Sequence, residues 1–122
     1  MFVLMISAKI MSVGPDAISK KDALAILFDE TATPDLKNIA IIQAIDDQKH
    51  QKFALKKGGK IKIGKTEYQI NFVGSLVNNN LQMIGHTTLE FKPVPEKPLE
   101  SAIYLTPNQF PEFKVGEEIM YM

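Results

Sequence analysis

Short apolar runs separated by turn residues make up most of the hydrophobic pattern of this chain. Runs of this kind, rich in β-branched residues and bounded by Gly, Pro and Asn, are typical of strands joined by tight turns. The pattern predicts about eight short strands, over Met1–Val13, Ala23–Phe28, Ile39–Ile45, Lys60–Ile63, Thr66–Val73, His86–Phe91, Ala102–Leu105 and Glu118–Tyr121.

Two other segments have helical features. Thr33 stands before Pro34, in the order of an N-cap residue followed by proline at the first helical position. Leu76–Ile84 has apolar residues at 76, 77, 81 and 84, a spacing that favours a short helix. Ala23–Phe28 is also compatible with a helix, because short apolar runs are ambiguous. The predicted fold is therefore mainly β, a small barrel or sandwich of about eight short strands with one or two short helices.

Composition narrows the functional classes. The 122 residues fit a single domain, 1–122, and include 14 Lys, no Arg, 14 acidic residues and no Cys. Without Cys there is no disulfide, thiolate or Cys-ligated zinc, and two His alone do not make a structural zinc site, so no metal or cofactor is expected. Zero net charge and the lack of Arg argue against a nucleic-acid partner. The apolar N-terminal run has no signal-peptide pattern, and we expect a cytoplasmic protein.

The lysines are unevenly distributed, with seven of the 14 between Lys49 and Lys65. One interpretation is a basic hairpin that binds an acidic partner or an anionic polymer. The other is a solvated face whose charges protect edge strands from aggregation. Only Phe53 lies inside the cluster to stack on a base, which disfavours nucleic acid.

The two histidines have different surroundings. His50 lies in a polar, Lys-rich stretch, where we expect it to be exposed and without a role. His86 follows Gly85 and precedes Thr87 and Thr88 at the start of a predicted strand. An imidazole oriented by neighbouring hydrogen bonds is a nucleophile or a proton carrier. The alternative is a half-buried His bonded to the backbone, and both interpretations remain open at this level.

The segment from Gly74 to Phe91 resembles a signature of the glucitol/sorbitol-specific enzyme IIA component of the bacterial sugar phosphotransferase system. The positions that match are Gly74, Ser75, Asn80, Leu81, Gly85, His86, Thr88, Leu89 and Phe91. Fainter similarity occurs at Val13-Gly14, Ala17-Ile18, Leu27-Phe28 and Pro34–Leu36. The resemblance implies a partly open β-barrel in the cytoplasm. It also implies a relay in which phosphocarrier protein HPr phosphorylates a His of this component, which then passes the group to enzyme IIB of the IIB/IIC sugar permease.

The chain departs from this pattern at the position of the phosphoacceptor. Counting from Asp35-Leu36 without gaps places the usual acceptor His at Gln43, which has no nucleophilic nitrogen. The chain also needs an insertion around Asp46–Lys52, and His50 falls within it. His86 matches a second family His that the resemblance places beside the acceptor. The candidate site is therefore His86, as acceptor by default, with the neighbours Gln43, Ser75, Asn80, Gly85 and Thr88.

Three functional hypotheses follow from these observations. The first is a phosphoryl carrier that uses His86, and the second is an acceptor-less homologue that binds or regulates its partners. The third, outside the family, is a small barrel that binds an anionic polymer through the lysines of 49–65. Unpaired edges in a partly open barrel would also allow a strand-exchanged homodimer.

Overall fold

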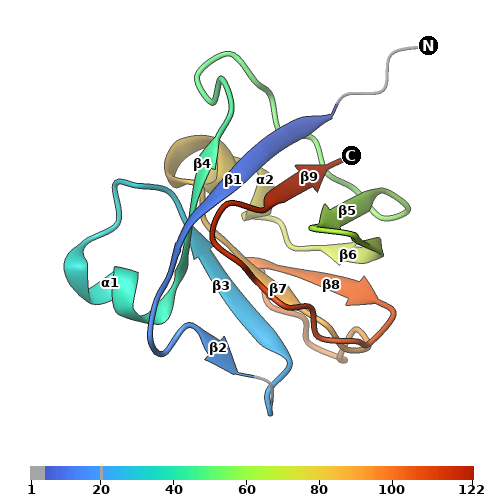
Figure 1. Cartoon of the computed structure of the whole chain (residues 1–122). Helices are drawn as coiled ribbons and strands as arrows, with labels where there is room; N and C mark the ends of the chain where they lie inside the picture. Colours follow the sequence, from blue (N-terminus) through green and yellow to red (C-terminus); the bar gives the residue numbers. More distant parts are fainter. Residues whose placement is uncertain (1–4, 20) are drawn as a thin grey trace.

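The structure, a computed structural model, describes residues 5–19 and 21–122 (Figure 1). Its strands are β1 (Ile6–Val13), β2 (Ile18–Ser19), β3 (Leu24–Phe28), β4 (Ile41–Ile45), β5 (Lys60–Ile63), β6 (Thr66–Val73), β7 (Thr87–Glu90), β8 (Ala102–Thr106) and β9 (Glu118–Tyr121). Its helices are α1 (Pro34–Ile39) and α2 (Val77–Ile84).

Eight of these strands form a closed ring. The hydrogen-bonded order β3-β4-β1-β9-β5-β6-β8-β7 returns to its start, because β7 also pairs with β3. Two of the strand pairs, β3–β4 and β7–β8, are parallel, and the other pairs of the ring are antiparallel. The predicted small β-barrel is thus confirmed. Its ring is closed, whereas the resemblance implied a partly open one.

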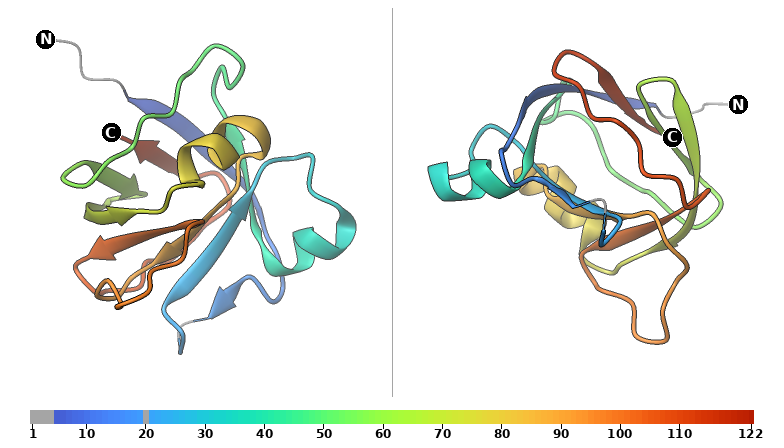
Figure 2. Two further views of the ribbon diagram at one scale, coloured as in Figure 1. Left: turned by 180° about the vertical axis from the view of Figure 1, so that it is seen from behind. Right: turned by 60° about the horizontal axis from the view of Figure 1, so that its bottom comes forward.

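The barrel (Figure 2) encloses an apolar core, and every strand of the ring contributes to this core. Alternation is clear in β6, where Tyr68 and Ile70 are buried and Glu67 and Gln69 are exposed, whereas β7 is buried at every position. Aromatic rings from the segment between β8 and β9 extend this core. There Phe110 and Phe113 pack edge-on against Phe91, with ring centroids 5.3 and 6.5 Å apart.

Both helices form as the sequence predicts. The Thr33 hydroxyl accepts a hydrogen bond from the N–H of Leu36 (3.4 Å), and Pro34 begins α1. In α2, Val77 and Leu81 are fully buried against the barrel. Because α2 ends one residue before Gly85, its position determines where His86 emerges.

The predicted strands also occur, with differences at their ends. Ile39 ends α1 instead of beginning β4, and β7 begins at Thr87 instead of His86. The short strand β2 has no counterpart in the prediction. Residues 1–4 of the predicted Met1–Val13 strand lie outside the described residues.

Candidate functional site

His86 lies between α2 and β7, where the helix ends and a strand begins almost at once. Gly85 ends the helix with a φ of 61°, and its N–H donates to the carbonyl of Leu81 (3.1 Å). The N–H of His86 then donates to the carbonyl of Asn80 (3.2 Å). Glycine is favoured at this position because it adopts the left-handed conformation without a Cβ penalty. The Gly85-His86 sequence therefore determines where the imidazole leaves the helix.

The imidazole of His86 is held by two contacts from β3. Its Nδ1 lies 3.0 Å from the carbonyl oxygen of Leu27, and its ring stacks on Phe28 with centroids 4.3 Å apart and planes at 20°. A carbonyl oxygen only accepts hydrogen bonds, so Nδ1 carries the hydrogen. In the neutral ring the lone pair is then on Nε2, which is the nucleophilic nitrogen.

Nε2 of His86 is open to an incoming group. Within residues 5–19 and 21–122, the only buried side-chain nitrogen or oxygen without a hydrogen-bond partner is Oε2 of Glu90. Nε2 of His86 makes no hydrogen bond in this part of the chain, and it therefore reaches solvent. The half-buried ring thus has one nitrogen fixed to the backbone and the other accessible.

Gln43 lies next to this connection but is fully buried. Its Nε2 donates to the carbonyl of Gly85 (3.0 Å), and its Oε1 accepts from the hydroxyl of Tyr121 (2.7 Å). Its exposed fraction is 0%. The Gln43 side chain therefore reaches the Gly85 carbonyl, directly before His86. It uses the amide to connect β4 and β9 to the end of α2.

Asp29 is a buried polar residue that the sequence pattern did not single out. One carboxylate oxygen accepts from the N–H of Thr31 (2.9 Å) and from its hydroxyl, and the other accepts from Nε2 of Gln48 (3.2 Å). Its N–H donates to the carbonyl of Ile84 at the end of α2 (3.0 Å). Asp29 therefore joins the segment after β3, the 46–52 loop and the helix end that precedes His86. The one sequence signal that could have indicated Asp29 was an acidic residue directly after a predicted strand.

The other expected neighbours of His86 are distributed along α2 and β7. Asn80 contributes its backbone carbonyl to the turn, and Thr88 follows two residues later on β7. Ser75 lies before the first residue of α2, so the eight-residue helix, about 12 Å long at 1.5 Å per residue, separates it from His86. Gln43 and Asn80 therefore meet the backbone at Gly85 and His86, Thr88 follows on β7, and Ser75 lies at the opposite helix end.

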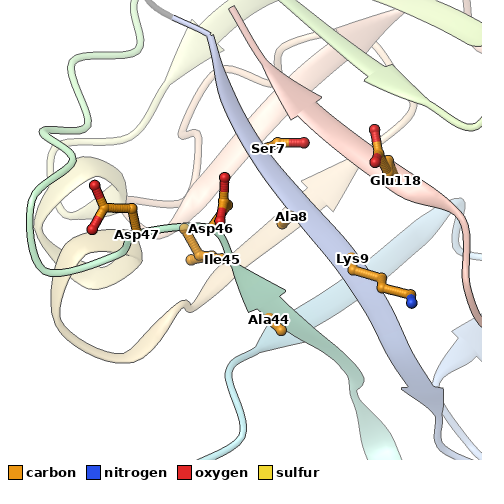
Figure 3. A pocket seen from close by; sticks show the side chains of 8 residues that line it. All are labelled: Ser7, Ala8, Lys9, Ala44, Ile45, Asp46, Asp47 and Glu118. Atoms are coloured by element: carbon orange, nitrogen blue, oxygen red, sulfur yellow. The ribbon is translucent and has the colours of Figure 1, made fainter.

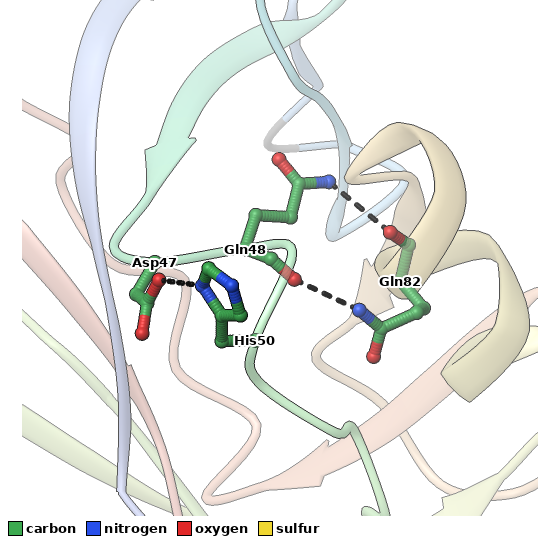
Figure 4. A network of polar contacts seen from close by, with 4 residues as sticks. All are labelled: Asp47, Gln48, His50 and Gln82. Atoms are coloured by element: carbon green, nitrogen blue, oxygen red, sulfur yellow. Dashed lines mark hydrogen bonds and ion pairs between the residues drawn. The ribbon is translucent and has the colours of Figure 1, made fainter.

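His50 is exposed on the 46–52 loop. Its Nδ1 lies 2.6 Å from Oδ1 of Asp47, and the exposed fraction of its side chain is 79% (Figure 4). The expectation that it is exposed is correct. Its pairing with a carboxylate was not anticipated.

A hollow of about 370 Å³ lies along β1, where it pairs with β4 and β9 (Figure 3). Its lining includes three carboxylates, those of Asp46, Asp47 and Glu118, and one lysine, Lys9. It contains neither His86 nor Gln43. The hollow is therefore separate from the connection that holds His86.

Burial of Tyr121 predicts a loss of stability in alkali. Desolvation raises the pKa of its hydroxyl above the usual value of 10.0. Above that pH the unfolded tyrosine loses its proton and the folded one keeps it, so the unfolded state binds fewer protons and stability falls as pH rises. We expect the free energy of unfolding, measured with urea, to fall by up to about 1.4 kcal/mol per pH unit for this group. In Tyr121→Phe the free energy of unfolding should depend less steeply on pH, by the contribution of about one proton. An unchanged pH dependence would contradict this assignment.

The chain is similar in sequence and fold to known proteins. A crystal structure of the IIA component of a phosphotransferase system from Enterococcus faecalis V583 is 39% identical, covers 95% of this chain and 98% of that one, and superposes with a TM-score of 0.89. The glucitol/sorbitol-specific IIA component of Escherichia coli (strain K12) is 30% identical over 97 residues, which is 79% of this chain and 76% of the relative. Its counterpart in Shigella flexneri is 31% identical over 90 residues, 74% and 69% of the two chains.

The fold and these similarities define a IIA component of the sugar phosphotransferase system. The model of the family described as "PTS system glucitol/sorbitol-specific IIA component" matches residues 5–120. The chain therefore belongs to the glucitol/sorbitol-specific IIA family.

Across residues 5–19 and 21–122, no helix has the length and apolar character required to cross a bilayer. In the same part of the chain, no group of three or more His, Cys, Asp or Glu side chains is arranged to bind a metal ion.

Proposed function

We propose that this protein carries a phosphoryl group on Nε2 of His86 in a glucitol/sorbitol-type phosphotransferase system. Phosphorylated HPr would be the donor, and enzyme IIB of the sugar permease would be the acceptor. The observation that carries the proposal is the bond from Nδ1 of His86 to the Leu27 carbonyl, because it leaves the lone pair on the solvent-accessible nitrogen. The cytoplasmic location expected from the sequence stays a prediction.

The phosphoryl transfer from HPr to His86 needs no cofactor. The P–N bond on the HPr histidine breaks as a P–N bond to Nε2 of His86 forms, and HPr leaves with a neutral imidazole. Nδ1 keeps its hydrogen, and the Leu27 carbonyl dipole stabilises the positive charge that the ring gains. Stacking on Phe28 limits rotation of the ring, so that Nε2 is already oriented for in-line attack. The Thr88 hydroxyl, two residues further along, is a donor that we expect to meet the phosphoryl oxygens.

A second candidate function rests on Gln43. The residue at the position where the resemblance implies the acceptor is fully buried, has no nucleophilic nitrogen and uses both amide atoms in structural hydrogen bonds. A family member of this kind would bind HPr or a permease component as a regulatory module without accepting phosphate.

The test is site-resolved mass spectrometry after incubation with phosphoenolpyruvate, enzyme I and HPr. We expect an acid-labile phosphoryl group on His86 in wild type and its absence in His86→Gln, with phosphoryl transfer to enzyme IIB reduced in parallel. Circular dichroism of His86→Gln verifies that the variant folds.

The contrary outcome is a chain without any phosphoryl group while HPr in the same tube is phosphorylated. Binding of HPr under those conditions would then favour the acceptor-less module. The Gln43→His variant further distinguishes the phosphoryl carrier from the acceptor-less module. Phosphorylation that appears only in this variant would show that the glutamine at position 43 had ended the chemistry.

A further inference from the structure

The 46–52 loop is attached to the helix end that precedes His86. Nε2 of Gln48 donates to the carbonyls of Leu81 and Gln82 (both 3.4 Å), and Nε2 of Gln82 donates back to the carbonyl of Gln48 (2.8 Å; Figure 4). Nε2 of Gln48 also donates to Asp29. These bonds, all outside the ladder of the barrel, give the loop a defined place beside α2.

Within this loop, Asp47 and His50 form a hydrogen-bonded pair. The N–H groups of His50 and Gln51 both donate to the carbonyl of Asp47 (2.9 and 3.1 Å), which closes a tight turn. Asp47 has a φ of 51°, an uncommon conformation for a residue with a side chain. The turn brings its carboxylate to Nδ1 of His50 at 2.6 Å. Nδ1 is thereby the hydrogen-bearing nitrogen, and Nε2 faces outward from an exposed ring.

The charges around His50 come mainly from its own loop. Lys49 and Lys52 are exposed, and neither is ion-paired within residues 5–19 and 21–122. Asp46 is the remaining carboxylate of the turn. The loop therefore carries two lysines and two carboxylates, and its unpaired lysines can interact with the oxygens of an anionic phosphoryl group.

We infer that His50 is a second phosphoryl acceptor of this protein, with Asp47 as its positioning residue. The inference rests on the proposed function, since phosphorylated HPr is the donor. An exposed Nε2 supplies the nucleophile, and the Asp47 carboxylate fixes the ring and stabilises the positive charge that forms on it. The P–N bond on HPr breaks as the P–N bond to Nε2 of His50 forms, and the hydrogen on Nδ1 remains shared with Asp47.

The experiment counts phosphoryl groups by intact mass on four full-length proteins: wild type, His86→Gln, His50→Gln and the double variant. Each is incubated with phosphoenolpyruvate, enzyme I and HPr. We expect two groups on wild type, one on each single variant and none on the double variant. NMR of the phosphorylated His86→Gln protein should show the Nε2 isomer at residue 50.

Each other distribution of phosphoryl groups among the four proteins either supports or overturns the inference. One group that disappears only in His86→Gln leaves the proposed function standing and overturns His50 as an acceptor. One group that disappears only in His50→Gln supports this inference and removes His86 from the relay. No group on wild type, with HPr phosphorylated, overturns both.

A matched pair of variants tests the role of Asp47. In the His86→Gln background, Asp47→Asn should slow phosphorylation of His50 about tenfold. Asp46→Asn removes the same charge one residue away without touching the imidazole, and it should leave the rate unchanged. Equal rates in the two variants would exclude a positioning role for Asp47.

Discussion

Gly85→Ala should lower the free energy of unfolding by about 2–5 kcal/mol and reduce phosphorylation of His86. A Cβ at this position would lie 2.6 Å from Cβ of Asp29 and 3.0 Å from its backbone nitrogen. The left-handed φ of 61° adds about 1–2 kcal/mol of backbone strain, and the steric overlap adds about 1–3 kcal/mol. Urea unfolding followed by circular dichroism measures the loss.

Gly58→Ala is the matched control for this change. Gly58 also has a positive φ, 94°, but a Cβ there would meet nothing within 4 Å. This variant isolates backbone strain, so we expect it to cost only about 1 kcal/mol. If both variants lost the same stability, close packing between Gly85 and Asp29 would not be the cause.

Gln43→Leu should destabilise the protein by about 2–6 kcal/mol. It removes the partner of two buried groups, the Tyr121 hydroxyl and the Gly85 carbonyl, and each unpaired buried group costs about 1–3 kcal/mol. Urea unfolding provides the measurement. Gln43→His is the conservative variant, because an imidazole keeps a donor nitrogen for the Gly85 carbonyl, whereas leucine has no polar atom. A loss in Gln43→Leu no larger than in Gln43→His would contradict this account.

A double-mutant cycle tests the Gln43–Tyr121 bond itself. Tyr121→Phe leaves Oε1 of Gln43 without its donor, and the double variant with Gln43→Leu removes both partners. We expect the double variant to be less destabilised than the sum of the single variants by about 1 kcal/mol or more. Additive losses would show that the two side chains contribute independently.

Local sequence patterns predicted most elements of the barrel. Alternation identified β5 and β6, and the order Thr33-Pro34 identified the start of α1, because these signals depend only on adjacent residues. Closure of the ring was not predictable in this way. It depends on β3 pairing with β7, and their partners, such as Leu27 and Thr87, are 60 positions apart in the chain.

The candidate site was predicted in part for the same reason. The Gly85-His86 motif indicated the imidazole, but its tautomer depends on the distant carbonyl of Leu27. The resemblance placed Gln43 at the usual acceptor position, and only the fold shows that its amide connects Tyr121 to the helix end. The role of Asp47 is similar, because a left-handed turn residue and its pairing with a side chain three positions later are not evident from composition.

The closing pair of strands has a consequence for the chemistry at His86. Leu27, whose carbonyl fixes the imidazole, also pairs with Thr87 and Ile41, so one residue belongs to β3–β7, β3–β4 and the histidine contact. A dimer formed by exchanging β3 or β7 would separate these partners within each subunit unless the second copy restored them. The NMR signals of the His86 ring therefore report both on the nucleophile and on whether the β3–β7 pairing that closes the barrel is intact.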